Sequence, residues 1–154
     1  MAVGIGPVHP DDVGELLTLQ RAAFVTEAQL YDDPRLPALV ETLPELLAAV
    51  QREPALTARD DGRLVGAVRA RVADGVLHVG RLVVAPDQQG RGIGRVLLAA
   101  VERAAGPDVA TAALSTGHRS AANLRLYARA GYVEQRRERV DDVLTVVHLA
   151  KPLR

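Results

Sequence analysis

The sequence predicts a mixed α/β (α+β) fold in which about four helices flank one central, mostly antiparallel sheet of about seven strands. Two observations lead to this prediction. Apolar residues recur at helical spacing in some stretches, and in others they alternate or run together as they do in strands. In the middle of the chain, Asp-Gly pairs typical of tight hairpins separate consecutive strand-like runs. With 154 residues, the chain is expected to form a single domain, residues 1–154.

The first third of the chain carries the signals of one strand and two helices. Residues 3–8 form a short strand-like run, and an amphipathic helix follows it. The prolines within residues 31–37 exclude regular structure there. A second helix is expected to begin at Thr42, because Thr42 and Glu45 have the spacing of a capping box, and to end before Pro54.

The middle of the chain is predicted to be an antiparallel meander. Its three strands cover residues 55–59, 64–72 and 76–84, which are rich in valine, leucine and alanine. The turns between them contain Asp61-Gly62 and Asp74-Gly75, pairs that suit short hairpin turns.

The last third of the chain alternates helices and strands. A helix over residues 93–104 carries apolar side chains at positions i, i+3, i+4 and i+7, and residues 109–115 form the next strand. Ser120 is placed to cap a helix that ends at Gly131. The chain ends in a hairpin whose strands are residues 133–140 and 144–150.

A glycine-rich loop at residues 89–95 separates the meander from the third helix. Gly90, Gly92 and Gly94 stand where a helix is about to begin, and there the backbone N–H groups lack helical partners and carry partial positive charge. This arrangement favours an anion such as phosphate. A helix dipole contributes only about 0.3–1 kcal/mol, whereas micromolar binding needs about 8 kcal/mol. The loop must therefore be one end of a longer site.

The predicted position of the loop also agrees with a ligand site. Strands joined through a crossover helix are parallel, so residues 76–84 and 109–115 should be parallel neighbours. The loop then lies at the carboxyl end of a sheet strand, where open α/β sheets bind ligands. Two common phosphate motifs do not match. The dinucleotide fingerprint needs a glycine where Arg95 stands, and the P-loop needs a Gly-Lys pair that the sequence lacks.

The composition excludes several classes of protein. Nineteen basic and nineteen acidic residues cancel, so no overall field attracts nucleic acid or an anionic membrane. The absence of cysteine excludes disulfides and thiolate chemistry. The sequence shows neither a signal-peptide pattern nor an apolar run of about 18 residues. A cytoplasmic protein with no nucleic-acid or membrane partner is expected.

Three motifs follow one another at ordinary spacing: Leu82-x-Val84-x-Pro86, then Gln89-x-x-Gly92-x-Gly94, then Asn123-x-x-x-Tyr127 with Gly131-Tyr132. Together they resemble the GNAT superfamily of N-acetyltransferases, and the order of elements agrees along nearly the whole chain, least well over residues 25–50. The resemblance implies acetyl-coenzyme A as co-substrate, without a metal. In this family the 76–84 strand parts from its parallel neighbour, and the pantetheine arm lies along it while the pyrophosphate binds the glycine loop. The coenzyme-binding residues that the resemblance implies are Leu82, Val83, Val84, Gln89, Gly90, Arg91, Gly92, Ile93, Gly94, Arg95 and Asn123.

Alternative roles remain for three of these residues. Arg91 and Arg95 either reach the coenzyme phosphates or are solvated. Asn123 either contacts the coenzyme or assists the cap at Ser120.

The implied reaction is direct transfer of an acetyl group from the thioester to an amine. An alkylammonium has a pKa of about 10.4, so a base must take its proton, and the departing thiolate must be stabilised or protonated. In this family the tyrosine at the place of Tyr127 lies beside the sulfur, which makes Tyr127 the predicted acid. The alternative is that Tyr127 is only a core aromatic residue.

The base is less well defined by the sequence. His78 stands where the histone-modifying branch of the family has a glutamate, and an imidazole, with an ordinary pKa of about 6.5, suits a base at neutral pH. A structural role for His78 is the alternative. In that case Glu27, Glu41, His118 or water alone would act as the base.

The segment from Val25 to Val50 corresponds to the part of this fold that usually covers the acceptor. Five acidic residues stand there against Arg35, which favours a cationic amine or is simply a solvated helix face. Glu27 and Tyr31 are the predicted acceptor-binding residues, although Tyr31 would equally fill a gap under the prolines. The acidic residues are Glu27, Asp32, Asp33, Glu41 and Glu45.

The sequence therefore predicts an N-acetyltransferase that acts on a primary amine of a small molecule or peptide. One alternative is a catalytically idle acyl-coenzyme A sensor, because the strand before the loop lacks a glutamate. Another is a nucleotide-phosphate module. Among relatives, homodimers are common.

Overall fold

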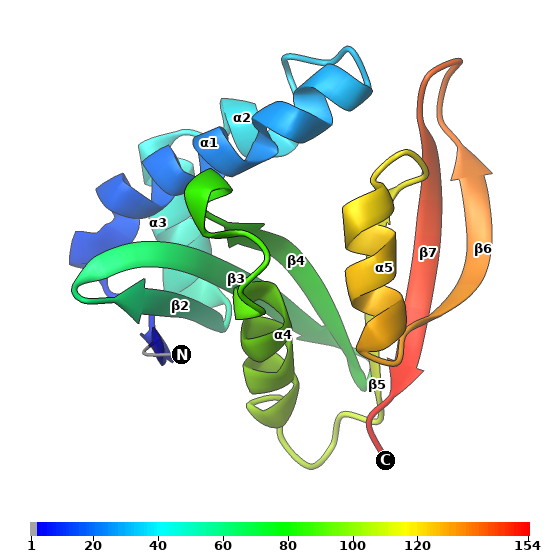
Figure 1. The fold of residues 1–154 in the computed structure, drawn as a ribbon. Helices are drawn as coiled ribbons and strands as arrows, with labels where there is room; N and C mark the ends of the chain where they lie inside the picture. The colour runs from blue at the N-terminus through cyan, green and yellow to red at the C-terminus, as the bar shows by residue number, and fades with distance from the viewer. Residues whose placement is uncertain (1–2) are drawn as a thin grey trace.

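A seven-stranded sheet runs through the protein, and the computed structural model describes it within residues 3–154. The strands are β1 (Val3–Pro7), β2 (Ala55–Asp60), β3 (Arg63–Ala73), β4 (Val76–Val84), β5 (Thr111–Gly117), β6 (Val133–Arg139) and β7 (Thr145–Pro152). Their order in the sheet is β1-β2-β3-β4-β5-β7-β6 (Figure 1). Among the strand pairs within residues 3–154, only β4–β5 is parallel, so the predicted mixed, mostly antiparallel sheet is confirmed.

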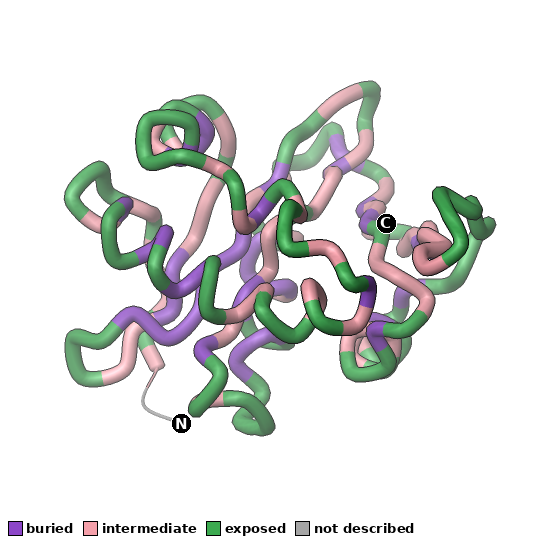
Figure 2. The backbone as a smooth tube through the Cα atoms, turned by 90° about the horizontal axis from the view of Figure 1, so that it is seen from above, coloured by how far each residue is buried: buried purple, intermediate pink, exposed green. Residues whose placement is uncertain are grey.

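Helices cover both faces of this sheet. They are α1 (Val13–Leu30), α2 (Pro37–Val40), α3 (Leu43–Arg52), α4 (Ile93–Arg103) and α5 (Ala121–Arg129). One buried cluster joins α1 and α3 to the sheet, and a second joins α4 and α5 to it. Buried residues accordingly lie in the interior of the molecule (Figure 2). The fifth helix, beyond the four expected, is the single turn α2, which Pro37 begins.

Local signals placed most elements correctly. Asp61 and Gly62 have φ of 50° and 82°, and the second turn repeats the pattern, so both predicted tight turns are confirmed. Thr42 and Glu45 form the predicted capping box. Gly131 has φ of 97°, and the N–H of Tyr132 donates to the Tyr127 carbonyl (2.9 Å), which ends α5 as predicted.

The strand β5 begins and ends two residues later than the sequence predicted. Its first residue, Thr111, lies opposite Val76, which directly follows the Asp74-Gly75 turn. The register with β4 therefore sets where β5 begins, and no local signal in the sequence records that register.

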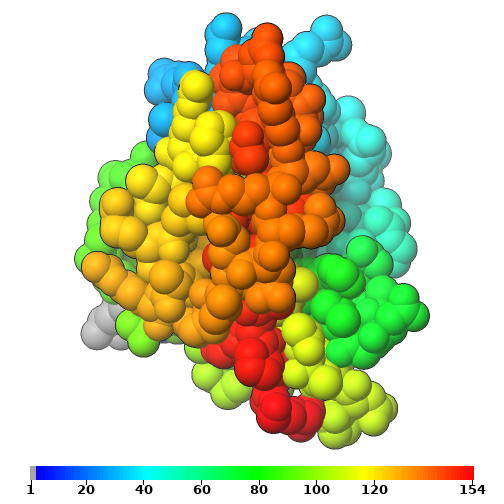
Figure 3. Space-filling model, turned by 90° about the vertical axis from the view of Figure 1, so that its right-hand side faces the viewer, coloured from blue at the N-terminus to red at the C-terminus, as the bar shows by residue number. Residues whose placement is uncertain are grey.

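One edge of the sheet is β1 and the other is β6, which with α5 forms most of the face shown in Figure 3. Every residue of β6 is exposed, and the strand carries three arginines and two glutamates. Alternating charges on an edge strand oppose pairing with other chains. None of the helices in residues 3–154 has both the length and the apolar character that crossing a membrane requires.

The parallel strands β4 and β5 part soon after they meet. Pairing covers only Val76–His78 against Thr111–Ala113, and the two strands then diverge (Figure 1). Beyond that point β4 stays paired with β3 as far as Val84, and β5 stays paired with β7 as far as Gly117. The edge of β4 that faces β5 therefore has no strand partner after His78 within the described chain. This is the divergence that the resemblance implied.

A β-bulge accompanies the divergence. The register between β3 and β4 shifts between Ala67 and Arg69, and Arg81 on β4 has φ of 48°. A bulge bends its strand and increases the local twist. We infer that this bend carries the end of β4 away from β5.

Candidate functional site

Beyond His78, β4 and β5 no longer pair, and the region where the two strands diverge is called the opening. The end of β4 borders this opening. The side chain of Val83 is buried against α1 and α3, whereas those of Leu82 and Val84 pack into the core on the α4 side. The three side chains thus pack into the two hydrophobic clusters on opposite faces of the sheet. Their backbone is what this edge of the sheet offers to a ligand.

The glycine loop leads from this strand edge into α4. Gly90 and Gly92 have φ of 81° and 80°, and Gly92 is the N-cap of α4 with no side-chain cap bond. The first helical bond runs from the Val96 N–H to the Gly92 carbonyl (3.1 Å), so the amides between these residues have no helical partner. The predicted helix N-terminus with free amides is therefore present.

The loop residues differ in what they contribute. The side chain of Ile93 is 1% exposed and lies in the core, so Ile93 offers a ligand only its backbone. Gly94 is buried, and an added Cβ would lie 3.3 Å from Leu126 on α5. Gly92 is required for its left-handed backbone, whereas Gly94 allows α4 and α5 to approach. The single role predicted for all the loop glycines, exposing amides to an anion, therefore does not describe Gly94.

The polar side chains of the loop are partly engaged. Arg91 forms an ion pair with Asp60 (3.0 Å), which ties the loop to β2. Gln89 and Arg95 are exposed and make no hydrogen bond or ion pair with any residue that the structure describes. Arg95 is thus the loop arginine available to a phosphate.

Tyr127 on α5 is buried, with 7% of its surface exposed, and its ring contacts Tyr132 edge-on at 6.1 Å. Burial, together with the nearby negative charge of Glu27, raises the pKa of Tyr127 to about 12. Its hydroxyl makes no hydrogen bond within residues 3–154. Tyr127 is therefore a protonated, unengaged donor at neutral pH.

A polar network joins α1 to the start of α5 across the opening. The carboxylate of Glu27 accepts hydrogen bonds from the hydroxyl of Ser120 and, at 3.5 Å, from the amide of Asn123. The hydroxyl of Tyr31 lies 2.7 Å from that of Ser120 and accepts from the Arg119 N–H at 3.0 Å. The predicted acceptor residues Glu27 and Tyr31 are thus brought together with the predicted coenzyme residue Asn123.

Sequence reasoning missed two members of this region. Ser120 occupies the N-cap position as predicted, but its hydroxyl makes no cap bond and binds Glu27 and Tyr31 instead. At Gly117, an added Cβ would lie 2.0 Å from the Tyr31 hydroxyl, so only glycine fits beneath this ring. A glycine just beyond the predicted strand was the one available signal.

The candidate bases occupy different environments. His78 is half-buried at the last position where β4 pairs with β5, opposite Ala113. It therefore lies at the vertex of the opening. His118 is engaged, because its Nδ1 accepts from the Thr145 N–H at 3.0 Å. Glu27 lies within the network described above, near Tyr127.

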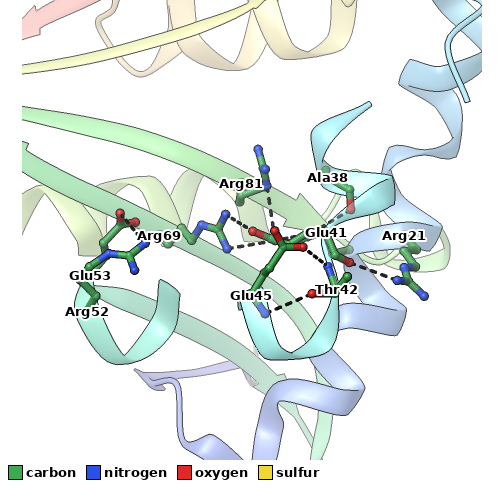
Figure 4. A network of polar contacts seen from close by, with 10 residues as sticks. Arg21, Ala38, Glu41, Thr42, Glu45, Arg52, Glu53, Arg69 and Arg81 are labelled. Carbon is green, nitrogen blue, oxygen red and sulfur yellow. Dashed lines mark hydrogen bonds and ion pairs between the residues drawn. The ribbon is translucent and has the colours of Figure 1, made fainter. Parts of the chain in front are cut away.

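Glu41 is unsuited to act as the base. Its carboxylate accepts two bonds from Arg69 (3.2 and 2.8 Å) and one from Gln20 (2.9 Å), as Figure 4 shows in part. Burial alone would raise the pKa of Glu41, but the hydrogen bonds from Arg69 and Gln20 and the charge of Arg81 outweigh it, and the pKa is lowered. The carboxylate stays ionised and occupied.

The acidic residues of the segment from Val25 to Val50 are largely committed within the protein. The carboxylate of Glu45 accepts from the Thr42 N–H, that of Asp33 accepts from the Arg35 N–H, and that of Glu41 is paired with arginines. The segment therefore presents less negative charge to an acceptor than its composition indicates.

Comparison with known proteins identifies the family to which the chain belongs. Residues 39–153 match the family model described as an acetyltransferase (GNAT) domain. The chain belongs to the GNAT acetyltransferase family. The UPF0157 protein YqkA of Bacillus subtilis (strain 168) is 33% identical over 143 residues, which are 88% of this chain and 39% of that protein. The chain thus spans about two fifths of the length of this relative.

Solved GNAT structures share the whole fold. The PaiA N-acetyltransferase of Thermoplasma acidophilum, in complex with coenzyme A, has a TM-score of 0.78 at 17% identity, over 99% of both chains. YncA of Salmonella typhimurium, a putative acetyltransferase with acetyl-coenzyme A, has a TM-score of 0.78 at 18% identity, over 100% of this chain and 95% of that one. The ribosomal-protein-S18-alanine N-acetyltransferase of Escherichia coli has a TM-score of 0.78 at 19% identity, over 98% and 94%.

The buried environment of Tyr127 predicts that its phenol ionises at an unusually high pH. A raised pKa means that the folded protein holds the phenolic proton more tightly than the unfolded chain does, so stability is fully present below pH 10 and falls as the pH rises through about 12. Absorbance titration of the folded protein should show a tyrosinate transition near pH 12 that Tyr127→Phe removes. A transition near pH 10 that disappears in this variant would contradict the described environment.

Proposed function

We propose that this GNAT domain transfers an acetyl group from acetyl-coenzyme A to a primary amine of a small molecule or peptide by direct attack. One observation carries the proposal: the unpaired edge of β4 leads directly into the helix N-terminus at Gly92. An extended arm with amide groups bonds to such an edge as another strand would, and a pyrophosphate suits the free amides. The coenzyme complexes of the structural relatives support the same donor.

The residues present fit this co-substrate. The backbone of Gly90 and Gly92 is left-handed and exposed, so no side chain covers the amides at the start of α4. The guanidinium of Arg95 adds a nearby positive charge. Leu82, Val83 and Val84 would bond the pantetheine arm through their backbone, and Asn123 would meet it from α5. The thioester supplies an activated acetyl group.

The transfer then needs one base and one acid. The amine nitrogen forms a bond to the acetyl carbon while the carbon–sulfur bond breaks. His78 accepts the proton that the ammonium must lose, since it lies where β4 and β5 part. Tyr127 donates a proton to the thiolate sulfur, because its high pKa keeps it protonated and its hydroxyl is otherwise unengaged. Glu27 and Tyr31 border the acceptor from α1.

Amine-dependent thiol release tests this assignment. With acetyl-coenzyme A and a panel of amines, we expect turnover that Tyr127→Phe slows by about 10²-fold, in line with the loss of a general acid. Tyr132→Phe is the matched control, because its hydroxyl is engaged by Glu102 on α4 (2.7 Å) and is assigned no role in the proposed reaction. Coenzyme A binding without turnover across the panel would instead favour an acyl-coenzyme A sensor.

Kinetics of two variants distinguish between the two remaining candidate bases, His78 and Glu27. His78→Gln should lower kcat/KM near neutral pH by about 10²-fold, whereas Glu27→Gln should act mainly on KM, since Glu27 lies among acceptor-binding groups. The measurement is kcat/KM and KM for the best amine between pH 6 and pH 9. A mild effect of His78→Gln with a large loss of kcat in Glu27→Gln would transfer the role to Glu27.

A further inference from the structure

Arg81 is the least satisfied charged side chain that the structure describes. It stands at the bulge of β4, and 27% of its side chain is exposed. Its Nε is buried without a hydrogen-bond partner, and its one ion contact, to Glu41, is long at 3.8 Å. No hydrogen bond from any of its five N–H groups to another residue is found within residues 3–154. A partly desolvated guanidinium in this state is costly unless something else binds it.

The protein does not supply that partner. The carboxylate of Glu41 is already filled by the paired bonds from Arg69 and the bond from Gln20. Two guanidiniums therefore face the carboxylate of Glu41, and Arg69 takes its hydrogen bonds while Arg81 stays at 3.8 Å. Burial lowers the pKa of Arg81, and the charge of Arg69 lowers it further, against the weaker pull of Glu41 and Glu53. Figure 4 shows the far end of the Arg81 guanidinium pointing away from Glu41.

The guanidinium of Arg81 lies on the same face of the sheet as the proposed base, His78. The register of β3 and β4 pairs Arg71 with His78 and Arg69 with Gly80, so these side chains share one face of the sheet. Arg81 contacts the cluster of Glu41 on that same face. Above Gly80 there is room, because no atom lies within 4 Å of an added Cβ. Along the strand, the Cα atoms of His78 and Arg81 are about 10 Å apart at ordinary strand rise.

We propose that Arg81 binds a carboxylate of the acceptor, so that the acceptor class is amines that carry a carboxylate, with α-amino acids as the simplest members. This inference rests on the proposed function and deepens it. A guanidinium binds a carboxylate through two parallel N–H bonds, which fixes the orientation of the bound molecule. Held in this way over Gly80, the amine of the acceptor points toward His78 and the opening. None of the acids that the structure describes in the segment from Val25 to Val50 accepts a hydrogen bond from Arg81, so its guanidinium keeps its donors for a ligand.

Product binding tests the inference without turnover. In the presence of coenzyme A, calorimetry compares N-acetyl amino acids with their N-acetyl primary amides, which lack the negative charge. We expect the acids to bind about 10- to 100-fold more tightly, as a charged hydrogen-bonded pair allows. Arg81→Gln should bring the ratio close to one, and Arg81→Lys should give an intermediate ratio, because lysine keeps the charge but lacks the fork. Arg136→Gln on β6 is the matched control and should keep the wild-type ratio.

Two outcomes would overturn the assignment: amides that bind the wild-type protein as tightly as the acids, or a preference for acids that survives Arg81→Gln. Turnover of amino acids, their amides and their decarboxylated amines is measured separately. Each rate is divided by the fraction of the amine that is unprotonated at the assay pH, because the three kinds of amine differ in pKa. If the acids bind through Arg81 but no amine is acetylated, the proposed function fails and the carboxylate site stands. If amines are acetylated with a preference for those without a carboxylate, the site fails and the function stands.

Thermal unfolding distinguishes a ligand-binding role from a structural one. A guanidinium kept for a ligand is a burden on the free protein, so Arg81→Gln should leave the Tm unchanged or higher. N-acetyl amino acids should then raise the Tm of the wild-type protein but not that of the variant. A lower Tm for Arg81→Gln, together with an equal response of both proteins to the ligand, would show that Arg81 serves the fold alone.

Discussion

The structure depends on the limited pairing between β4 and β5. The two strands share one short parallel ladder that ends at His78, after which each keeps only its other neighbour. Backbone groups left without partners away from water cost about 1–3 kcal/mol each, so an open strand edge is maintained only where water or a ligand reaches it. We attribute the open edge to the bulge at Arg81, because a bulge bends its strand. The glycine loop and the polar network are arranged around this edge.

Separate sets of contacts stabilise the two ends of β4 and β5: the closed end, where the strands pair, and the open end, where they diverge. At the closed end, Glu102 on α4 accepts hydrogen bonds from Tyr132 (2.7 Å) and from Lys151 on β7 (2.8 Å), which joins the two halves of the sheet. At the open end, Glu27 and Tyr31 on α1 bind Ser120. The first set is part-buried, and it borders the packed core that contains Tyr132. The second joins the C-terminal end of α1 to the residue that precedes α5, across the divergence of the two strands.

Sequence reasoning succeeded where the determinant is local. The capping box at Thr42, the Asp-Gly turns and the C′ glycine at Gly131 each need only a few neighbouring residues, and the glycine loop marks a helix N-terminus in the same way. It could not find contacts that depend on tertiary packing. Tyr31 and Ser120 are 89 positions apart, and their meeting depends on how α1 crosses the opening.

Charge counts along the chain were misleading for the same reason. Glu41 adds to the acidity of its segment in the sequence, but in the fold it is neutralised by Arg69 on β3. The run around Arg81 was predicted as a continuous strand because of its valines and leucines, although Gly80 is the kind of residue that often accompanies a bulge. The unusual environment of Arg81 could be recognised only from its contacts in the fold.

Binding of coenzyme A, measured by calorimetry on the wild-type protein and on Gly92→Val, tests the central claim most directly. The account predicts micromolar affinity for coenzyme A, weaker binding of ATP, and a loss of at least about 10²-fold in Gly92→Val, because valine cannot adopt the left-handed backbone that presents the amides. An unchanged affinity in Gly92→Val, or ATP binding as tight as that of coenzyme A, would contradict it.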